Sequence, residues 1–262
     1  MDKYQDFYTG SEYAENNPTW DIEDTNWKAK KILDIIQSVD AAPKSICEIG
    51  CGSGGILASL RDAYPDIQLT GYDIAPSAAN FWGQWDGLDL NLKTGNFLTE
   101  DSNQYDILML IDVLEHLADP HAFLKAITGR SQYLIIHFPL DLSAISVFRE
   151  SPLLHVRRKV GHIHYFTKNL AFELLRESGY KILDYRYTQA YKSAPQRSQV
   201  SKLFGFLREA LYWFSKDVGV RLLGGETLMV ITETPKKQST TDNQRNPAFS
   251  GKTASYGSSH TD

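Results

Sequence analysis

A carboxylate and a run of glycines occur together in the stretch SICEIGCGSGG, residues 45–55. Glu48 lies within a short apolar run, and Gly50, Gly52 and Gly55 follow at the spacing G-x-G-x-x-G. Glycines in this pattern let the backbone between a strand and a helix approach a ligand closely. The stretch therefore predicts a nucleotide-type cofactor at this turn.

The acids expected around this turn bear on the charge of the cofactor. Asp73 follows the next apolar run, where an acid that binds ribose hydroxyls belongs, and Asp112 and Glu115 come just after a later apolar run. Two unit charges about 4 Å apart interact by roughly 4 kcal/mol at an effective dielectric constant of about 20. An acid-lined pocket therefore disfavours the pyrophosphate of a dinucleotide. We expect S-adenosylmethionine, which carries a sulfonium and an ammonium group, and keep a nicotinamide-dependent oxidoreductase as the alternative.

Three histidines are expected near the same pocket and are predicted to be catalytic: His116, His162 and His164. Methyl transfer requires the acceptor to lose a proton, and imidazole is the side chain suited to accept one near neutral pH. His162 and His164 alternate in GHIHYF, so an extended chain turns them to opposite sides and one of the two is expected to face the substrate. The alternative for each histidine is a structural role, in which it caps an element or bonds the backbone.

Two arginines in HVRRKVGH, residues 155–162, are predicted to bind substrate. Guanidinium groups form paired hydrogen bonds with phosphate or carboxylate groups, so Arg157 or Arg158 would hold such a group on the acceptor. The alternative is a charged loop in solvent.

Alternating apolar and amphipathic stretches supply the scaffold for these residues. Repeated strand–helix units predict a parallel sheet with helices on both faces, and a ligand beyond the carboxyl ends of the strands. The amphipathic stretches and their capping residues predict helices over 27–39, 56–64, 75–85, 120–129 and 167–179. The expected strands are 45–49, 67–74, 90–97 with its loop, 105–114, 133–138, 180–187 and 226–234.

Composition limits the classes of function. The formal net charge of −5 argues against a nucleic-acid partner, which calls for a basic face. The polar N-terminus has no signal-peptide core, and no run reaches the roughly 18 apolar residues of a membrane span. Cys47 and Cys51 do not form the pattern of a disulfide framework or a zinc site. We therefore expect a cytoplasmic protein, with no prediction of its oligomeric state.

Three regions are expected along the chain. Residues 1–44 are predicted to form a helical cap region, 45–234 the cofactor-binding domain and 235–262 a disordered tail, because the tail has almost nothing to bury. Residues 189–225 interrupt the strand–helix alternation. The amphipathic segment VSKLFGFLREALYWF within them predicts either a lid or a peripheral packing helix.

Five stretches resemble, in order, the motifs of class I S-adenosylmethionine-dependent methyltransferases, in the ubiquinone-biosynthesis-like branch that carries a D-V-L-E-H run. They are CEIGCGSGG, LTGYDIAP, GNFLTE, IDVLEHLADP and GHIHYFTKNLAFELLRESGY. The resemblance covers roughly residues 45–185. It implies an α/β fold with a doubly wound, mostly parallel, Rossmann-like sheet of seven strands in the order 3-2-1-4-5-7-6, with strand 7 antiparallel.

The resemblance also implies roles for single residues. Glu48 would orient the methionine part of the cofactor indirectly, and Asp73 would accept hydrogen bonds from both ribose hydroxyls. Asn96 would accept a bond from the adenine amino group, at a position where relatives often have Asp. The full set of cofactor-binding residues expected from the resemblance is Glu48, Gly50, Gly52, Asp73, Ile74, Asn96, Phe97 and Asp112, with Ile74 and Phe97 on the adenine faces.

The activity implied is methylation, at an oxygen, of a small-molecule or sugar-containing acceptor. A sugar is the first expectation because ENNPTWDIEDTNWKAKKILDII resembles relatives encoded with surface-polysaccharide genes. A cofactor-binding protein without catalytic activity remains a further alternative. We expect no metal, although some relatives with an acid-x-x-Glu-His run bind magnesium. Asp112, Glu115 and His116 match that spacing, and His162 or His164 would complete such a site.

Overall fold

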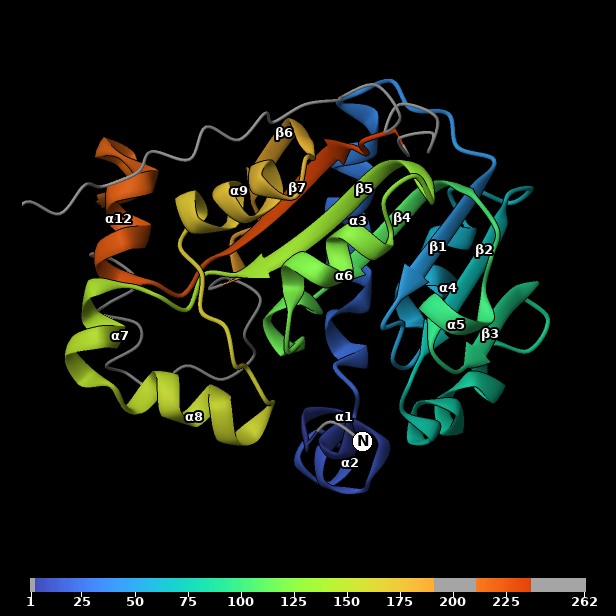
Figure 1. Cartoon of the computed structure of the whole chain (residues 1–262), viewed down its shortest axis with the longest axis horizontal. Coiled ribbons are helices and arrows are strands. Elements are labelled where there is room, and N and C mark those ends of the chain that lie inside the picture. The colour runs from blue at the N-terminus through green and yellow to red at the C-terminus, as the bar shows by residue number, and fades with distance from the viewer. Residues whose placement is uncertain (1–2, 191–210, 237–262) are drawn as a thin grey trace, which may run out of the picture.

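The sheet has seven strands and sits between two layers of helices (Figure 1). The computed structural model describes residues 3–190 and 211–236. The strand order is β3-β2-β1-β4-β5-β7-β6, and β7 is antiparallel to both β5 and β6. This confirms the fold expected from the sequence. The strands are β1 (Ser45–Ile49), β2 (Gln68–Asp73), β3 (Leu90–Thr94), β4 (Tyr105–Ile111), β5 (Ser131–Pro139), β6 (Lys181–Tyr187) and β7 (Thr227–Glu233).

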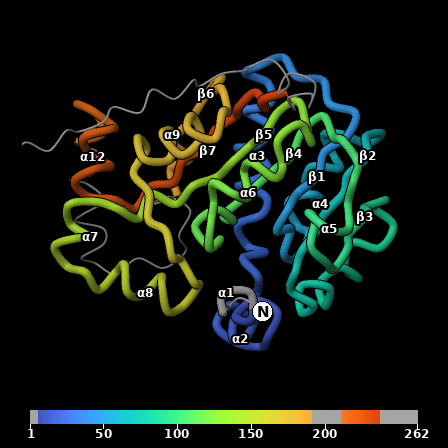
Figure 2. Tube along the Cα trace, in the orientation of Figure 1, coloured from blue at the N-terminus to red at the C-terminus, as the bar shows by residue number. Residues whose placement is uncertain are grey.

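The helices connect the strands and cover both faces of the sheet (Figure 2). Before β1 come α1 (Lys3–Thr9), α2 (Glu12–Asn16), η1 (Ile22–Asp24) and α3 (Thr25–Gln37). Between β1 and β5 come α4 (Gly55–Arg61), η2 (Pro76–Trp85), α5 (Phe97–Glu100), η3 (Leu114–His116) and α6 (Pro120–Ala126). After β5 come α7 (Ala144–Arg149), α8 (Ser151–Lys159), α9 (Lys168–Glu177) and α12 (Lys216–Leu223).

Local sequence signals explain several helix starts. The Asp119 carboxylate accepts a hydrogen bond from the Ala122 backbone N–H, with Pro120 in the first turn of α6. Thr167 caps α9 in the same way through Leu170. The helix expected over residues 75–85 is a 3₁₀-helix, Pro76–Trp85. The charged loop considered as the alternative for residues 155–162 is wrong for residues 155–159, which belong to α8.

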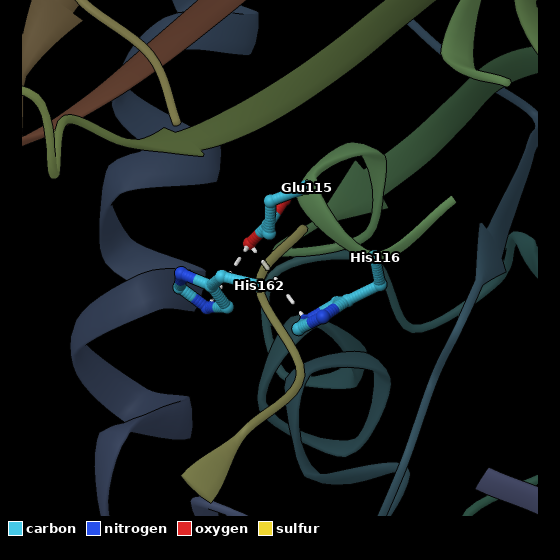
Figure 3. A group of neighbouring side chains, drawn as sticks. All are labelled: Glu115, His116 and His162. Carbon is cyan, nitrogen blue, oxygen red and sulfur yellow. Dashed lines mark ion pairs between the residues drawn. The ribbon is translucent and has the colours of Figure 1, made fainter. Parts of the chain in front are cut away.

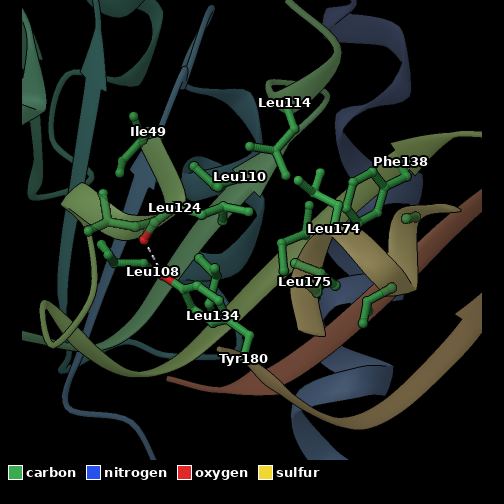
Figure 4. Close-up of a cluster of buried hydrophobic side chains, with 14 of the residues drawn as sticks. Ile49, Leu108, Leu110, Leu114, Leu124, Leu134, Phe138, Leu174, Leu175 and Tyr180 are labelled. Carbon is green, nitrogen blue, oxygen red and sulfur yellow. Dashed lines mark hydrogen bonds between the residues drawn. The ribbon is translucent and has the colours of Figure 1, made fainter. Parts of the chain in front are cut away.

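Successive residues of the central strands point to opposite faces of the sheet and pack into two apolar clusters, one on each face. On β4, Leu108 and Leu110 join the cluster formed with α6 and α9, which Figure 4 shows. Ile107 and Met109 join the cluster formed with α3 and α4 on the opposite face. Burial on both faces accounts for the nearly unbroken apolar run that predicted this strand.

The N-terminal helices lie beyond the edge of the sheet toward which the parallel strands point (Figure 1). The Tyr8 hydroxyl is 2.7 Å from Nδ1 of His116, and the Asn17 side chain donates to the carbonyl of Lys159. These contacts connect the start of the chain to the loops after β4 and β5. The domain boundaries expected from the sequence stay predictions, and most of the segments 189–225 and 235–262 lies outside the described residues. Within residues 3–190 and 211–236, no helix has the length and apolar character needed to cross a membrane.

Asp101 joins β2, β4 and the residue before β5 through its carboxylate. Its carboxylate accepts hydrogen bonds from the Tyr72 and Tyr105 hydroxyls, both at 2.9 Å, and pairs with Arg130 at 2.7 Å. Burial alone would raise the pKa of Asp101, but the hydrogen bonds from Tyr105 and Tyr72 outweigh it, so the pKa lies below its ordinary value.

We predict that Asp101→Asn lowers the free energy of unfolding by about 2 kcal/mol at pH 7, because bonds to an ionised acceptor are lost. A carboxyl group with a depressed pKa stabilises the fold above its unfolded pKa of about 4, and this contribution disappears as the pH falls through the folded value. The difference between wild type and variant in urea denaturation should therefore shrink as the pH falls below about 4. The exposed Asp62→Asn serves as the control, and a pH-independent difference would contradict the account.

Candidate functional site

A cavity of about 550 Å³ opens at the carboxyl ends of the parallel strands. Its size is typical of a site for a cofactor or small ligand. The loops after β1, β2, β3 and β4 line it, together with α3, part of α1 and the turn before α9. This is the position that the topology predicts for a ligand in a doubly wound fold.

The glycine turn forms one wall of the cavity. Gly50 and Gly52 have φ angles of +79° and +49°, which favour glycine. The N–H groups of Gly50 and Cys51 donate to the Tyr72 carbonyl at 2.7 and 3.0 Å. A Cβ atom on Gly50 would lie 2.7 Å from a methyl group of Val113. The sequence thus needs glycine here both for the backbone angle and for the close approach of the loop after β4.

The indole rings of Trp82 and Trp85 fix the turn from the outside. Their N–H groups donate to the carbonyls of Gly52 and Ser53 at 2.9 and 2.7 Å. Both tryptophans come from η2, so the segment after β2 holds the turn after β1. These anchors were not expected from the sequence.

Asp73 lies at the tip of β2 and faces the same turn. Its carboxylate accepts hydrogen bonds from the backbone N–H groups of Gly52 and Ala75, both at 2.8 Å. Burial raises the pKa of Asp73, although these two bonds act in the opposite direction. Asp73 and its neighbour Ile74 both line the cavity, and their roles toward the nucleoside stay predictions.

Glu48 is a buried acid without a bonding partner. Its side chain lines the cavity and is 1 % exposed, and Oε2 makes no hydrogen bond within the described part of the chain. Burial raises the pKa of Glu48 well above its ordinary value, and the nearby Lys28 only partly offsets this. A buried carboxyl group in this state favours a ligand that brings a donor or a positive charge.

Asp112 lies in the loop after β4 and is bonded on two sides. Nζ of Lys28 lies 3.0 Å from Oδ2, and Nδ1 of His137 lies 2.6 Å from Oδ1. Burial would raise the pKa of Asp112, but the charges of His137 and Lys28 lower it below its ordinary range. Its φ angle of +55° is uncommon for a residue other than glycine. Lys28 and His137 were missed by the sequence analysis, because neither lies near Asp112 along the chain.

Asn96 and Phe97 follow β3 and line the cavity. The Asn96 side-chain oxygen caps α5 by accepting from the Leu98 N–H at 2.9 Å. Phe97 is 2 % exposed, and its ring contacts Tyr72 and Arg130. Both residues line the cavity, but these side chains already serve the helix cap and the core. Their roles toward adenine stay predictions.

Glu115, His116 and His162 all line the cavity, and Figure 3 shows their side chains turned toward one another. Oε1 of Glu115 lies 3.9 Å from Nε2 of His116 and 4.0 Å from Nε2 of His162. Burial raises the pKa of Glu115 well above its ordinary value and lowers the pKa of His116 to about 4. His164 lies outside the lining, where its Nε2–H group donates to the Leu117 carbonyl at 2.9 Å.

The two predicted substrate-binding arginines are not brought into this cavity. Arg157 and Arg158 lie on α8 and are exposed. Arg158 lines a separate surface depression with His155 and Lys159. Their proposed contact with an acidic group of the acceptor stays a prediction.

Aromatic residues of the N-terminal segment cover the cavity. Tyr8, Tyr13 and Trp20 all line it. The ring centroids of Tyr8 and Tyr13 are 5.1 Å apart, and those of Tyr13 and Trp20 are 5.0 Å apart. The aromatic residues of this acidic segment were the signal that could have identified it as part of the site.

Comparison with known proteins places the chain in a family. A family model described as a methyltransferase domain matches residues 25–185. The chain belongs to this family, and its strand order is that of the class I S-adenosylmethionine-dependent methyltransferases.

Individual relatives match shorter stretches. A malonyl-[acyl-carrier protein] O-methyltransferase of Anoxybacillus flavithermus is 38% identical over 64 residues, which are 24% of each chain. A ubiquinone biosynthesis O-methyltransferase of Bordetella bronchiseptica is 31% identical over 90 residues, 32% of this chain and 36% of that protein. The matches thus span well under half of the length of these relatives.

Solved structures share the fold over most of the chain. The plantazolicin methyltransferase BpumL, crystallised with S-adenosylhomocysteine and a monoazolic desmethylPZN analog, has a TM-score of 0.59 and 17% identity, covering 89% of this chain and 94% of that one. The N-methyltransferase NodS of Bradyrhizobium japonicum has a TM-score of 0.55 and 14% identity, covering 90% of this chain and 100% of that one.

We predict that Gly50→Ala lowers the free energy of unfolding by about 1–3 kcal/mol, because an L side chain at this φ is strained. Gly83→Ala is the matched control, since its Cβ would meet nothing within 4 Å, and it should change stability by less than about 0.5 kcal/mol. Chemical denaturation of both variants measures the difference. Equal effects at the two positions would show that the turn does not require glycine.

Proposed function

We propose that this protein is an S-adenosylmethionine-dependent methyltransferase that acts on an oxygen atom of a small-molecule or sugar-containing acceptor. The observation that carries the proposal is the buried, unpartnered Glu48 beside the glycine turn, with Asp73 at the neighbouring strand tip. A carboxyl group without a cation of its own suits a cofactor with a positive charge at that point.

The residues around the turn fit this cofactor. Gly50 and Gly52 bring bare backbone to the cavity wall, and Asp73 presents a carboxylate that is fixed by two backbone bonds. Lys28 provides a positive side chain for a ligand carboxylate, at the end of the cavity that Glu48 and Asp112 share. When bound, S-adenosylmethionine supplies a methyl group on a positively charged sulfur. The nicotinamide alternative gains no support, because these acids would oppose a pyrophosphate.

The part of the cavity lined by Glu115, His116 and His162 is the proposed acceptor site. Asp141 accepts a hydrogen bond from Nδ1 of His162 at 2.7 Å, which leaves the lone pair on Nε2 of the neutral ring. His162 Nε2 would then accept a hydrogen bond, and finally a proton, from the acceptor hydroxyl. The aromatic residues of the N-terminal segment would exclude water from this end.

The choice of oxygen and of a small acceptor rests on two supports. The curated relatives described above are O-methyltransferases by name. The cavity of about 550 Å³ suits a cofactor together with a small group rather than a folded macromolecule. A sugar-containing acceptor is the first class of compound to test.

We expect S-adenosylhomocysteine to bind the full-length protein with one site per chain in isothermal titration calorimetry, and NADH not to bind. Asp73→Asn should weaken S-adenosylhomocysteine binding at least about tenfold, because the ribose loses an ionised acceptor. Asp66→Asn, in the exposed turn before β2, is the control and should leave affinity unchanged. NADH binding without S-adenosylhomocysteine binding would refute the proposed cofactor.

Methyl transfer itself is tested with labelled S-adenosylmethionine and fractionated metabolite extracts that include nucleotide sugars and glycans. His162→Gln should lower transfer about 100-fold or more, as expected for loss of an acid–base group, with unchanged affinity for S-adenosylhomocysteine. The exposed His155→Gln on α8 is the control. Cofactor binding without transfer to any fraction would favour the non-catalytic alternative, and full transfer by His162→Gln would exclude that residue from the reaction.

A further inference from the structure

We infer that Glu115, His116 and His162 form a binding site for one divalent transition-metal ion at the acceptor end of the cavity. The carboxylate oxygen and the two imidazole nitrogens all lie within 4.8 Å of one another (Figure 3). The inference rests on the proposed function only for the role of the ion. The binding of a metal stands on the geometry of these three side chains.

The buried Glu115 carboxylate is the first part of the argument. Its side chain is 0 % exposed, and neither oxygen has a hydrogen-bond partner in residues 3–190 and 211–236. Burying a carboxyl group without a hydrogen-bond partner costs free energy, so a ligand that compensates this cost is expected beside Glu115. A cation held against Oε1 would be such a ligand.

Both imidazole rings are held with Nε2 turned toward Glu115. Nδ1 of His162 must donate to the Asp141 carboxylate, since a carboxylate oxygen only accepts. The Tyr8 hydroxyl lies 2.7 Å from Nδ1 of His116 and 3.2 Å from the Val160 carbonyl, so when it donates to that carbonyl, Nδ1 of His116 donates to the Tyr8 oxygen. With the ring protons on Nδ1, each imidazole presents the lone pair of Nε2 to Glu115.

Histidines that bind metals commonly donate the other ring N–H to a carboxylate or another oxygen in this way. Asp141 and Tyr8 thus act as positioning residues for the two imidazoles. Direct hydrogen bonds do not account for the position of Glu115, because its Oε1 lies 3.9 and 4.0 Å from the two Nε2 atoms, which is longer than a hydrogen bond.

The distances also suit an ion between the groups. Zinc bonds of about 2.0–2.1 Å in a tetrahedral site hold neighbouring ligand atoms about 3.3 Å apart. The two Nε2 atoms would each need to approach Glu115 by roughly half an ångström, and they would also need to approach each other. Two imidazoles and one carboxylate leave at least one coordination position open to the cavity.

The donor set indicates which ion binds. Imidazole nitrogen favours zinc, iron, copper or nickel, whereas magnesium and calcium prefer oxygen. The magnesium set considered from the sequence, with Asp112, is not assembled, because Lys28 and His137 already bind that carboxylate. In the proposed reaction, the ion would lower the pKa of an acceptor hydroxyl at the open position. His162 would then hold the ion instead of acting as the base, and the released proton would pass to water.

Cobalt is the probe for this site, because its visible absorption reports both binding and geometry. Untagged, full-length protein treated with EDTA should bind one Co²⁺ per chain, and Zn²⁺ should displace it. Glu115→Gln and His162→Gln should each weaken Co²⁺ binding at least about 100-fold, and Asp141→Asn about 10–100-fold through the orientation of His162. His121→Gln, a partly exposed histidine that contacts Ser178, is the matched control and should bind as wild type.

Absence of Co²⁺ binding by wild type, or unchanged binding by both Glu115→Gln and His162→Gln, would overturn the inference and leave a bridging water as the occupant. Circular dichroism of each variant establishes that it is folded. The same EDTA-treated samples are titrated with S-adenosylhomocysteine. Cofactor binding without cobalt binding refutes the metal site alone, and cobalt binding without cofactor binding refutes the proposed function alone.

Discussion

The site depends on an imbalance of charge inside the cavity. Glu48, Asp73, Asp112 and Glu115 all line it, and Lys28 is the one lysine or arginine among the described lining residues. That lysine is bonded to Asp112, so Glu48 keeps no cation of its own. Burial of like charges is unfavourable unless a ligand compensates them. We propose that a cationic cofactor does so at the Glu48 end, and a metal ion at the Glu115 end.

The fold keeps these acids close together because each one is held in place by a different strand or loop. The tip of β1 carries Glu48, the tip of β2 carries Asp73, and the loop after β4 carries Asp112. Backbone bonds from Gly50 and Cys51 to the Tyr72 carbonyl close the turn between the first two strands. The two tryptophans of η2 hold the same turn from outside. The carboxylates therefore cannot relax away from one another without loss of these bonds.

Much of the fold could be predicted from the sequence, because strand burial and helix caps are local signals. The apolar run of β4 and the Thr167 cap are examples. The order of the strands was predicted from the resemblance to class I methyltransferases and not from a local signal. The glycine turn and the acids at the strand tips could also be predicted from the sequence. The sequence did not predict the roles of Lys28, His137 and Tyr8, because their contacts with Asp112 and His116 join segments that are distant in the sequence. Asn96 and Phe97 were identified from a motif, but the motif does not reveal that Asn96 caps α5 and that Phe97 belongs to the core.

The most direct test of the central claim is a crystal structure of the protein soaked with S-adenosylhomocysteine and, separately, with NADH. The account predicts a thioether ligand with its amino acid part beside Gly50 and Glu48 and its ribose hydroxyls on the Asp73 carboxylate. Diphosphate density over the glycine turn in the NADH crystal, with no thioether ligand in the other, would contradict it.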